Sequence, residues 1–232
     1  LRKASIFTLI FCVITTYSMP YIFQYTPMKY FNRHPNQLIY TIIAINLAVF
    51  GAWRLPAFWK FTNRYFLLEK NSMYSMSSMI GSAFSHQEFW HIAMNMMCLY
   101  SLGSLVSVVG SSNFTTMYLN CAVLSSLASL AFPILARIPK FASLGASGAL
   151  FGLFGCFAYL FPKSQILLFF LPIPGGAWIA FLASMGWNLC GCLFRWGSFD
   201  YAAHLGGSVA GIYYGWWISE QSKRKRENRM KK

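Results

Sequence analysis

The sequence predicts an all-α polytopic membrane protein, and its composition is the first reason. Hydrophobic residues make up 56% of the 232 residues and charged residues only 10%, whereas a soluble domain carries roughly 25% charged residues. The mean hydropathy is +0.46, so the chain lacks the polar surface that a soluble protein needs on every side. Its apolar runs do not alternate with period two, which favours helices over a transmembrane barrel.

Seven apolar segments have about the length that a membrane helix needs, roughly 20 residues. We expect spans near residues 5–23, 37–54, 89–110, 114–135, 146–162, 176–194 and 199–219. The first follows Leu1-Arg-Lys and resembles a signal peptide. We interpret it as a retained helix of a processed or truncated chain. The resulting division is 1–36, an N-terminal transmembrane helix and linker; 37–219, a six-helix core; and 220–232, a basic tail.

The basic residues point to lipid rather than to nucleic acid. The net charge is +14, and seven of the nineteen Lys and Arg residues lie in the tail at 223–232. We expect this tail to be solvated and attracted to anionic lipid. Aromatic and basic residues also mix between 55 and 85, as in segments that lie in the membrane interface. A single-stranded nucleic acid is the less favoured partner for that mix.

The six cysteines lie in or beside apolar segments, which favours packed, reduced thiols. Cys190-Gly-Cys192 is at most a weak metal half-site, because no partner stands at ligand spacing. The histidines lack an HExxH pattern. We therefore expect neither a metal nor a cofactor.

A serine and a histidine are the most informative polar residues. Ser147 lies in Ser143-Leu-Gly-Ala-Ser147-Gly-Ala-Leu-Phe-Gly152, and His204 lies in Asp200-Tyr-Ala-Ala-His204. Ionisable residues at membrane depth are costly, so they indicate a functional site. Serine is a weak nucleophile unless a base takes its proton, and a histidine suits that task at neutral pH. Alone, Ser147 would more often be a packing residue.

The order of the spans brings further polar residues to the same face of the membrane. Counting after the first helix, spans 2, 4 and 6 begin on one side, and they carry His91 with Asn95, Ser147, and His204. His91 and Asn95 share a helix face at i, i+4 spacing. With the amide of Ser147 they form a candidate oxyanion hole. We expect His86 to brace the loop that leads into span 2.

Glycines give these spans a way to meet. Gly148 and Gly152 on one span, and Gly207 and Gly211 on the other, form ridges that let helix backbones approach closely.

The sequence leaves two roles for an acidic residue near the serine and the histidine. Asp200 lies one turn before His204, so it is either a catalytic acid or, as we favour, a cap for the last span.

These residues resemble the rhomboid intramembrane serine proteases. The resemblance rests on Phe84-Ser-His86-x4-His91-x3-Asn95-Met96, Gly145-Ala-Ser147-Gly148 and Ala203-His204-x2-Gly207-x3-Gly211. It covers roughly residues 37 to 219 and is most similar to fungal mitochondrial members with a 1+6 helix layout.

The resemblance implies an intramembrane serine endopeptidase with a Ser147–His204 dyad and an oxyanion hole at His91, Asn95 and Ser147. It implies single-pass membrane proteins as substrates, including a dynamin-related fusion GTPase and imported proteins with a bipartite presequence. The mitochondrial inner membrane would be its location, and the fifth core span its lateral gate. It also implies supporting roles for the residues that surround the dyad, which are His86, Phe151, Gly145, Gly148, Gly207 and Gly211.

Two departures from the family pattern stand out. Phe151 occupies the place where bacterial relatives often have a tyrosine, and Gly103-Ser-Leu-Val-Ser107 lacks the glutamate that many members carry there. The alternatives are a catalytically dead rhomboid-like binding protein or chaperone, and a transporter or channel. The first would lack Ser147 or His204. The second would more often show charges or broken helices near mid-membrane.

Overall fold

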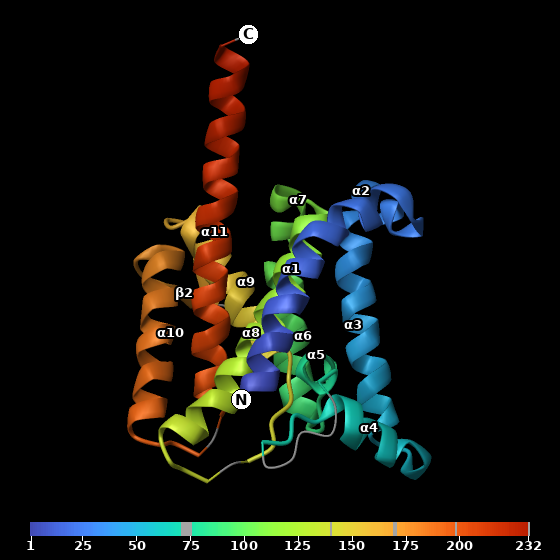
Figure 1. Ribbon diagram of the computed structural model, residues 1–232. Helices are drawn as coiled ribbons and strands as arrows, with labels where there is room; N and C mark the ends of the chain where they lie inside the picture. The colour runs from blue at the N-terminus through green and yellow to red at the C-terminus, as the bar shows by residue number, and fades with distance from the viewer. Residues whose placement is uncertain (71–75, 140, 169–170, 198, 232) are drawn as a thin grey trace.

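The computed structural model describes residues 1–70, 76–139, 141–168, 171–197 and 199–231, and its described part is mostly helical (Figure 1). The four helices that are long and apolar enough to cross a membrane, among the described residues, are α1 (Arg2–Tyr25), α3 (Pro35–Ala52), α8 (Ser111–Leu135) and α10 (Gly176–Leu193). They coincide with four of the expected spans. The prediction of an all-α polytopic membrane protein is confirmed.

The other three expected spans differ in length from the prediction. The span at 89–110 is wrong as a single helix, because α6 (Phe89–Leu102) ends just before Gly103 and a short α7 (Leu105–Val109) follows. Glycine is a poor helix former, and Gly103 packs so close to Ile39 that a Cβ there would lie 3.0 Å from its side chain. Helix α9 (Ser147–Leu160) has 14 residues, about 21 Å at 1.5 Å per residue.

Helix α11 (Tyr201–Met230) is longer than the expected span at 199–219. It continues without a break into the basic tail, because Lys, Arg, Gln and Glu are good helix formers outside the membrane as well. In Figure 1 its C-terminal half projects beyond the rest of the bundle.

Two short strands, β1 (Ile166–Leu168) and β2 (Leu171–Ile173), form an antiparallel pair, with Ile166 opposite Ile173. The sequence led us to expect only a helix break in this region. Gly175 and Gly176, at φ +89° and +76°, then turn the chain into α10. Such positive φ values are readily adopted only by glycine.

The connection before α6 contains several short helical segments. They are η2 (Pro56–Phe58), α4 (Trp59–Phe66), α5 (Ser78–Gly81) and η3 (Ser82–Phe84), after η1 (Pro27–Lys29) and α2 (Tyr30–Arg33) earlier in the chain. On α4, Trp59 and Phe61 are exposed beside Lys60 and Arg64. The sequence predicts that this aromatic and basic surface lies in the membrane interface, and that location stays a prediction.

Helix α9 is the centre of the bundle and packs against α11, α8, α6 and α10. Helix α1 packs along α8, where Thr15 donates to Asn120 Oδ1 at 2.5 Å and Asn120 donates to Tyr214 on α11 at 2.6 Å. The N-terminal helix is thus joined to the core by polar contacts.

Candidate active site

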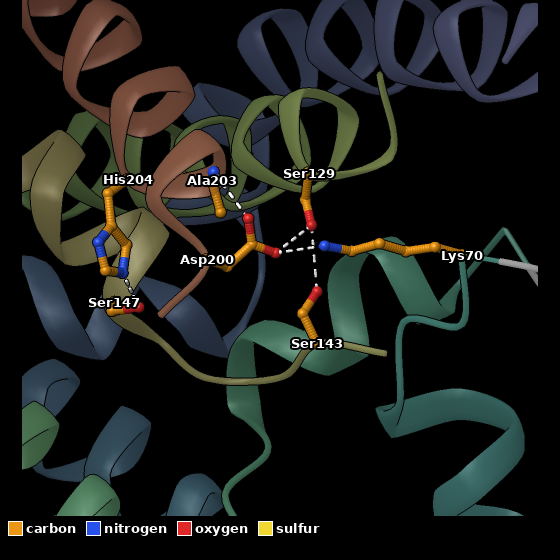
Figure 2. A network of polar contacts seen from close by, with 7 residues as sticks. All are labelled: Lys70, Ser129, Ser143, Ser147, Asp200, Ala203 and His204. Atoms are coloured by element: carbon orange, nitrogen blue, oxygen red, sulfur yellow. Dashed lines mark hydrogen bonds and ion pairs between the residues drawn. The ribbon is translucent and has the colours of Figure 1, made fainter. Parts of the chain in front are cut away.

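Ser147 and His204 are in hydrogen-bond contact. The distance from Ser147 Oγ to His204 Nε2 is 2.8 Å, and the two residues come from the first turns of α9 and α11 (Figure 2). They are 57 positions apart in the sequence, so only the packing of the two helices brings them together. His204 is buried, whereas Ser147 is half-buried.

Glycines permit this contact, as the sequence predicts. A Cβ at Gly207 would overlap the carbonyl oxygen of Gly148, and one at Gly211 would overlap the carbonyl oxygen of Gly152. The backbones of α9 and α11 therefore touch directly along two turns. Because the nucleophile candidate has a short side chain, this close approach is what lets it reach the imidazole ring.

The loop before Ser147 is held by backbone and side-chain contacts. Gly145, at φ +131°, donates its N–H to Ser82 O at 2.8 Å. The N–H of Ala146 donates to His86 Nε2 at 3.3 Å. His86 thus contacts the loop that carries Ser147, whereas from the sequence we expected it to brace the loop before α6. Burial, with His91 nearby, lowers the pKa of His86 to about 3, which keeps its ring neutral and able to accept this hydrogen bond.

His91 lies close to the serine loop. A Cβ at Gly145 would be 2.8 Å from His91 Nε2, so a side chain at Gly145 would displace the imidazole. The ring of His91 also packs edge-on against His86, with 4.9 Å between centroids.

Asn95 shares a cavity of about 200 Å³ with Ser147 and apolar side chains. The other lining residues are Met94, Cys98, Leu150, Phe151 and Phe154. Asn95 donates one amide hydrogen to His91 O at 2.7 Å. An amide nitrogen carries two hydrogens, so one remains for a group in the cavity. Asn95 and Ser147 therefore line one cavity, whereas His91 lies beside Gly145 in the loop before Ser147.

Two further side chains contact the imidazole of His204. Phe151, one turn after Ser147, stacks on it with 4.4 Å between ring centroids and 25° between planes. On the other nitrogen, His204 Nδ1 is 2.8 Å from Asn188 Oδ1. Sequence analysis missed Asn188. The signal was a lone carboxamide within the apolar run at 176–194, since polar groups inside membrane helices often mark a site.

Asp200 caps α11 and does not contact the imidazole nitrogens. Its Oδ1 accepts from the N–H of Ala203 at 3.1 Å, and its Oδ2 accepts from Lys70 Nζ at 2.8 Å and from the hydroxyl of Ser129. Figure 2 shows the carboxylate directed toward Lys70 and Ser129 and away from the ring of His204. The alternative that we favoured from the sequence, a capping role, therefore agrees with the geometry.

The same cluster holds the serine loop. The hydroxyls of Ser129 and Ser143 are hydrogen-bonded at 3.1 Å. Ser143 also forms two backbone hydrogen bonds with Leu68, at 2.9 and 3.0 Å. Ser143 precedes Ser147 by four residues, and Asp200 precedes His204 by four. The segments that carry the two candidate reacting groups are thus anchored to one polar cluster.

Comparisons with known proteins agree with this fold. Residues 73–221 match the Rhomboid domain family. The chain is 55% identical over 217 residues to "Rhomboid protein 1, mitochondrial" of Saccharomyces cerevisiae. The aligned residues cover 92% of this chain and 63% of that protein. It is 35% identical over 178 residues to the human "Presenilin-associated rhomboid-like protein, mitochondrial", covering 75% of this chain and 46% of that protein.

A bacterial relative extends the range of the similarity. The "Rhomboid protease GluP" of Bacillus subtilis is 29% identical over 124 residues, 53% of this chain and 22% of that protein. The chain spans less than two thirds of the length of each of these relatives. With the apolar helices described above, the similarity to mitochondrial relatives identifies a mitochondrial integral membrane protein. The extent of the family match and the identity to these relatives show that the chain belongs to the rhomboid family.

Proposed function

We propose that the protein is an intramembrane serine endopeptidase that cleaves single-pass membrane proteins in or near their transmembrane segment. The observation that carries the proposal is the 2.8 Å contact between Ser147 Oγ and His204 Nε2. A serine becomes a useful nucleophile when a base lies within hydrogen-bond reach of its hydroxyl. Membership of a family that includes a protein named as a protease adds to this support.

In the proposed reaction, His204 Nε2 takes the proton of Ser147 as Oγ bonds to the carbonyl carbon of the scissile peptide. The negative charge on the carbonyl oxygen would be held by the N–H of Ser147 at the start of α9, where the helix dipole is positive, and by His91 and Asn95. A single donor of this kind is worth roughly 3–4 kcal/mol in the transition state. The imidazolium then gives its proton to the leaving amine as the C–N bond breaks, and water hydrolyses the acyl-enzyme.

The supporting residues have structural tasks in this scheme. His86 and Gly145 hold the serine loop, and Phe151 packs on the general base. Gly148, Gly207 and Gly211 allow α9 and α11 to touch. The proposed location is the mitochondrial inner membrane, and the proposed substrates are precursors with a bipartite presequence and a membrane-anchored fusion factor.

The test is cleavage of a single-pass reporter by the purified protein in liposomes. We expect Ser147→Ala and His204→Ala each to abolish cleavage and to abolish labelling by a fluorophosphonate probe, while both variants stay folded. The matched controls are Ser101→Ala on α6 and His34→Ala before α3, because both residues are exposed and outside the site. Cleavage that persists in either active-site variant would refute the dyad, and a wild-type protein that binds the reporter without cutting it would favour the binding-protein alternative.

A further inference from the structure

Asn188 is the one group bonded to the nitrogen of His204 that faces away from Ser147, among the residues that the structure describes. Its Oδ1 lies 2.8 Å from His204 Nδ1, and both side chains are buried. Asn188 is on α10, whereas Ser147 and His204 are on α9 and α11. The imidazole is therefore held between side chains from two other helices.

The orientation of the Asn188 amide is fixed by a second bond. Its Nδ2 donates to the carbonyl oxygen of Ser184, one turn earlier on α10, at 2.8 Å. A backbone carbonyl can only accept, so the nitrogen of the amide must face Ser184 and the oxygen must face His204. An amide oxygen is likewise only an acceptor, and His204 Nδ1 must carry a hydrogen to bond to it.

This chain of bonds decides which nitrogen of His204 is basic. In a neutral imidazole one nitrogen carries the proton and the other accepts, and the partner of the first sets the tautomer. With Nδ1 protonated toward Asn188, Nε2 is left with a lone pair that faces the hydroxyl of Ser147. The opposite tautomer would direct an N–H at Ser147 and could not take its proton.

We infer that Asn188 is a positioning residue that holds His204 in the Nδ1–H tautomer, which completes a neutral Ser147–His204–Asn188 relay. The reaction role of the relay rests on the proposed protease function, but the tautomer does not. Asn188 has no charge to offer the imidazolium, so its contribution is orientation of the ring and choice of tautomer. Because Asn188 is on α10, the position of α10 decides which nitrogen of His204, on α11, carries the lone pair.

The first measurement is ¹⁵N NMR of histidine-labelled full-length protein at pH 8, with the His204 signals assigned by their loss in His204→Gln. We expect a protonated Nδ1 and a bare Nε2 in the wild type. In Asn188→Leu, which removes the acceptor and keeps similar volume, we expect the Nε2–H tautomer to become populated. Asn188→Asp keeps an oxygen that accepts from Nδ1–H, and we expect it to restore the wild-type pattern.

The matched control is Asn46→Leu. Asn46 is also a buried asparagine in a membrane helix, and it donates to the carbonyl of Ile42 on its own helix α3. The Asn46→Leu variant also loses a buried amide, but at a position that does not contact His204. The tautomer of His204 should therefore stay as in the wild type. A wild-type spectrum with the proton on Nε2 overturns the inference, whether or not Asn188→Leu folds. An unchanged Nδ1–H signal in Asn188→Leu overturns it as well.

The second measurement is cleavage of the reporter. General-base catalysis contributes about 10²- to 10⁴-fold, so we expect kcat to fall at least about tenfold in Asn188→Leu with KM nearly unchanged, and to recover partly in Asn188→Asp. Equal kcat in Asn188→Leu and wild type refutes the role in the reaction. If the wild type shows the Nδ1–H tautomer but neither cleaves nor reacts with a fluorophosphonate, the proposed function fails while the tautomer assignment stands.

Discussion

Lys70 and Asp200 form an ion pair, with 2.8 Å between Lys70 Nζ and Asp200 Oδ2. Asp200 lies one helical turn before His204 in the sequence. The side chains are 10% and 19% exposed, so the pair is largely withdrawn from water. Through Ser129 it also reaches Ser143, four residues before Ser147. The pair therefore ties the start of α11 to the loop that precedes α9.

Lys70→Met should destabilise the protein, because it leaves the Asp200 carboxylate buried without its cation. Breaking a buried pair by removing one partner costs about 3–5 kcal/mol, and the lower end applies here because the pair keeps some contact with water. Thermal unfolding in detergent measures the effect. Lys163→Met, at an exposed lysine, is the control.

The double variant Lys70→Met/Asp200→Asn should be less destabilised than the sum of the two single variants, because it leaves no unpaired charge. Strict additivity of the single effects would show that the two residues do not stabilise each other.

The Asp200 carboxyl also predicts a pH dependence of stability. Burial alone would raise its pKa, but Lys70, together with the bonds from Ser129 and the Ala203 N–H, holds the pKa of Asp200 below its usual 3.8. A carboxyl with a depressed pKa stabilises the fold above its unfolded pKa, and that contribution is lost as the pH falls through the folded value.

The wild type should therefore lose part of its Tm advantage over Lys70→Met as the pH falls from about 5 to below the usual carboxyl pKa of 3.8. Tm measured in detergent across this range tests the expectation. An advantage that grows on acidification would contradict it.

Gly211→Ala should separate α9 from α11, because the new methyl group would overlap the carbonyl oxygen of Gly152. We expect a lower Tm, a longer Ser147–His204 distance and a loss of cleavage of at least about tenfold, since catalysis depends on sub-ångström placement. Gly186→Ala on α10 is the matched control, because nothing lies within 4 Å of its added Cβ. Alanine is the better helix former by about 1 kcal/mol, so this control should be neutral or stabilising.

Phe151→Ala should reduce cleavage, because the ring of His204 loses the aromatic surface stacked at 4.4 Å. Such ring pairs contribute about 0.5–1.5 kcal/mol, which predicts a fall in kcat of about 2- to 12-fold. Phe151→Tyr keeps the stacking and should cleave at a rate close to that of the wild type. Steady-state kinetics with the reporter separate the two variants, and a rate for Phe151→Ala equal to wild type would show that stacking has no role.

The sequence predicted the helical membrane fold because that feature is local. Apolar runs of membrane length identified α1, α3, α8 and α10. The odd and even order of the spans predicted that His91, Ser147 and His204 lie toward the same face of the membrane, since antiparallel helices return to the same side. The same reasoning could not locate the break at Gly103 or the extension of α11 to Met230, because these depend on neighbouring helices and on the helix propensity of the tail.

Tertiary structure alone decided which polar groups surround His204. Local spacing made Asp200 a candidate acid, but Lys70 and Ser129, distant in sequence, draw its carboxylate to another cluster. Asn188 is an isolated amide in an apolar helix, and only the packing of α10 beside α11 brings it to Nδ1. The sequence by itself determined where the long apolar helices lie and which chemical groups they carry. The contacts between helices decided how those groups pair, because a hydrogen bond needs partners within about 3 Å and no local pattern encodes that distance.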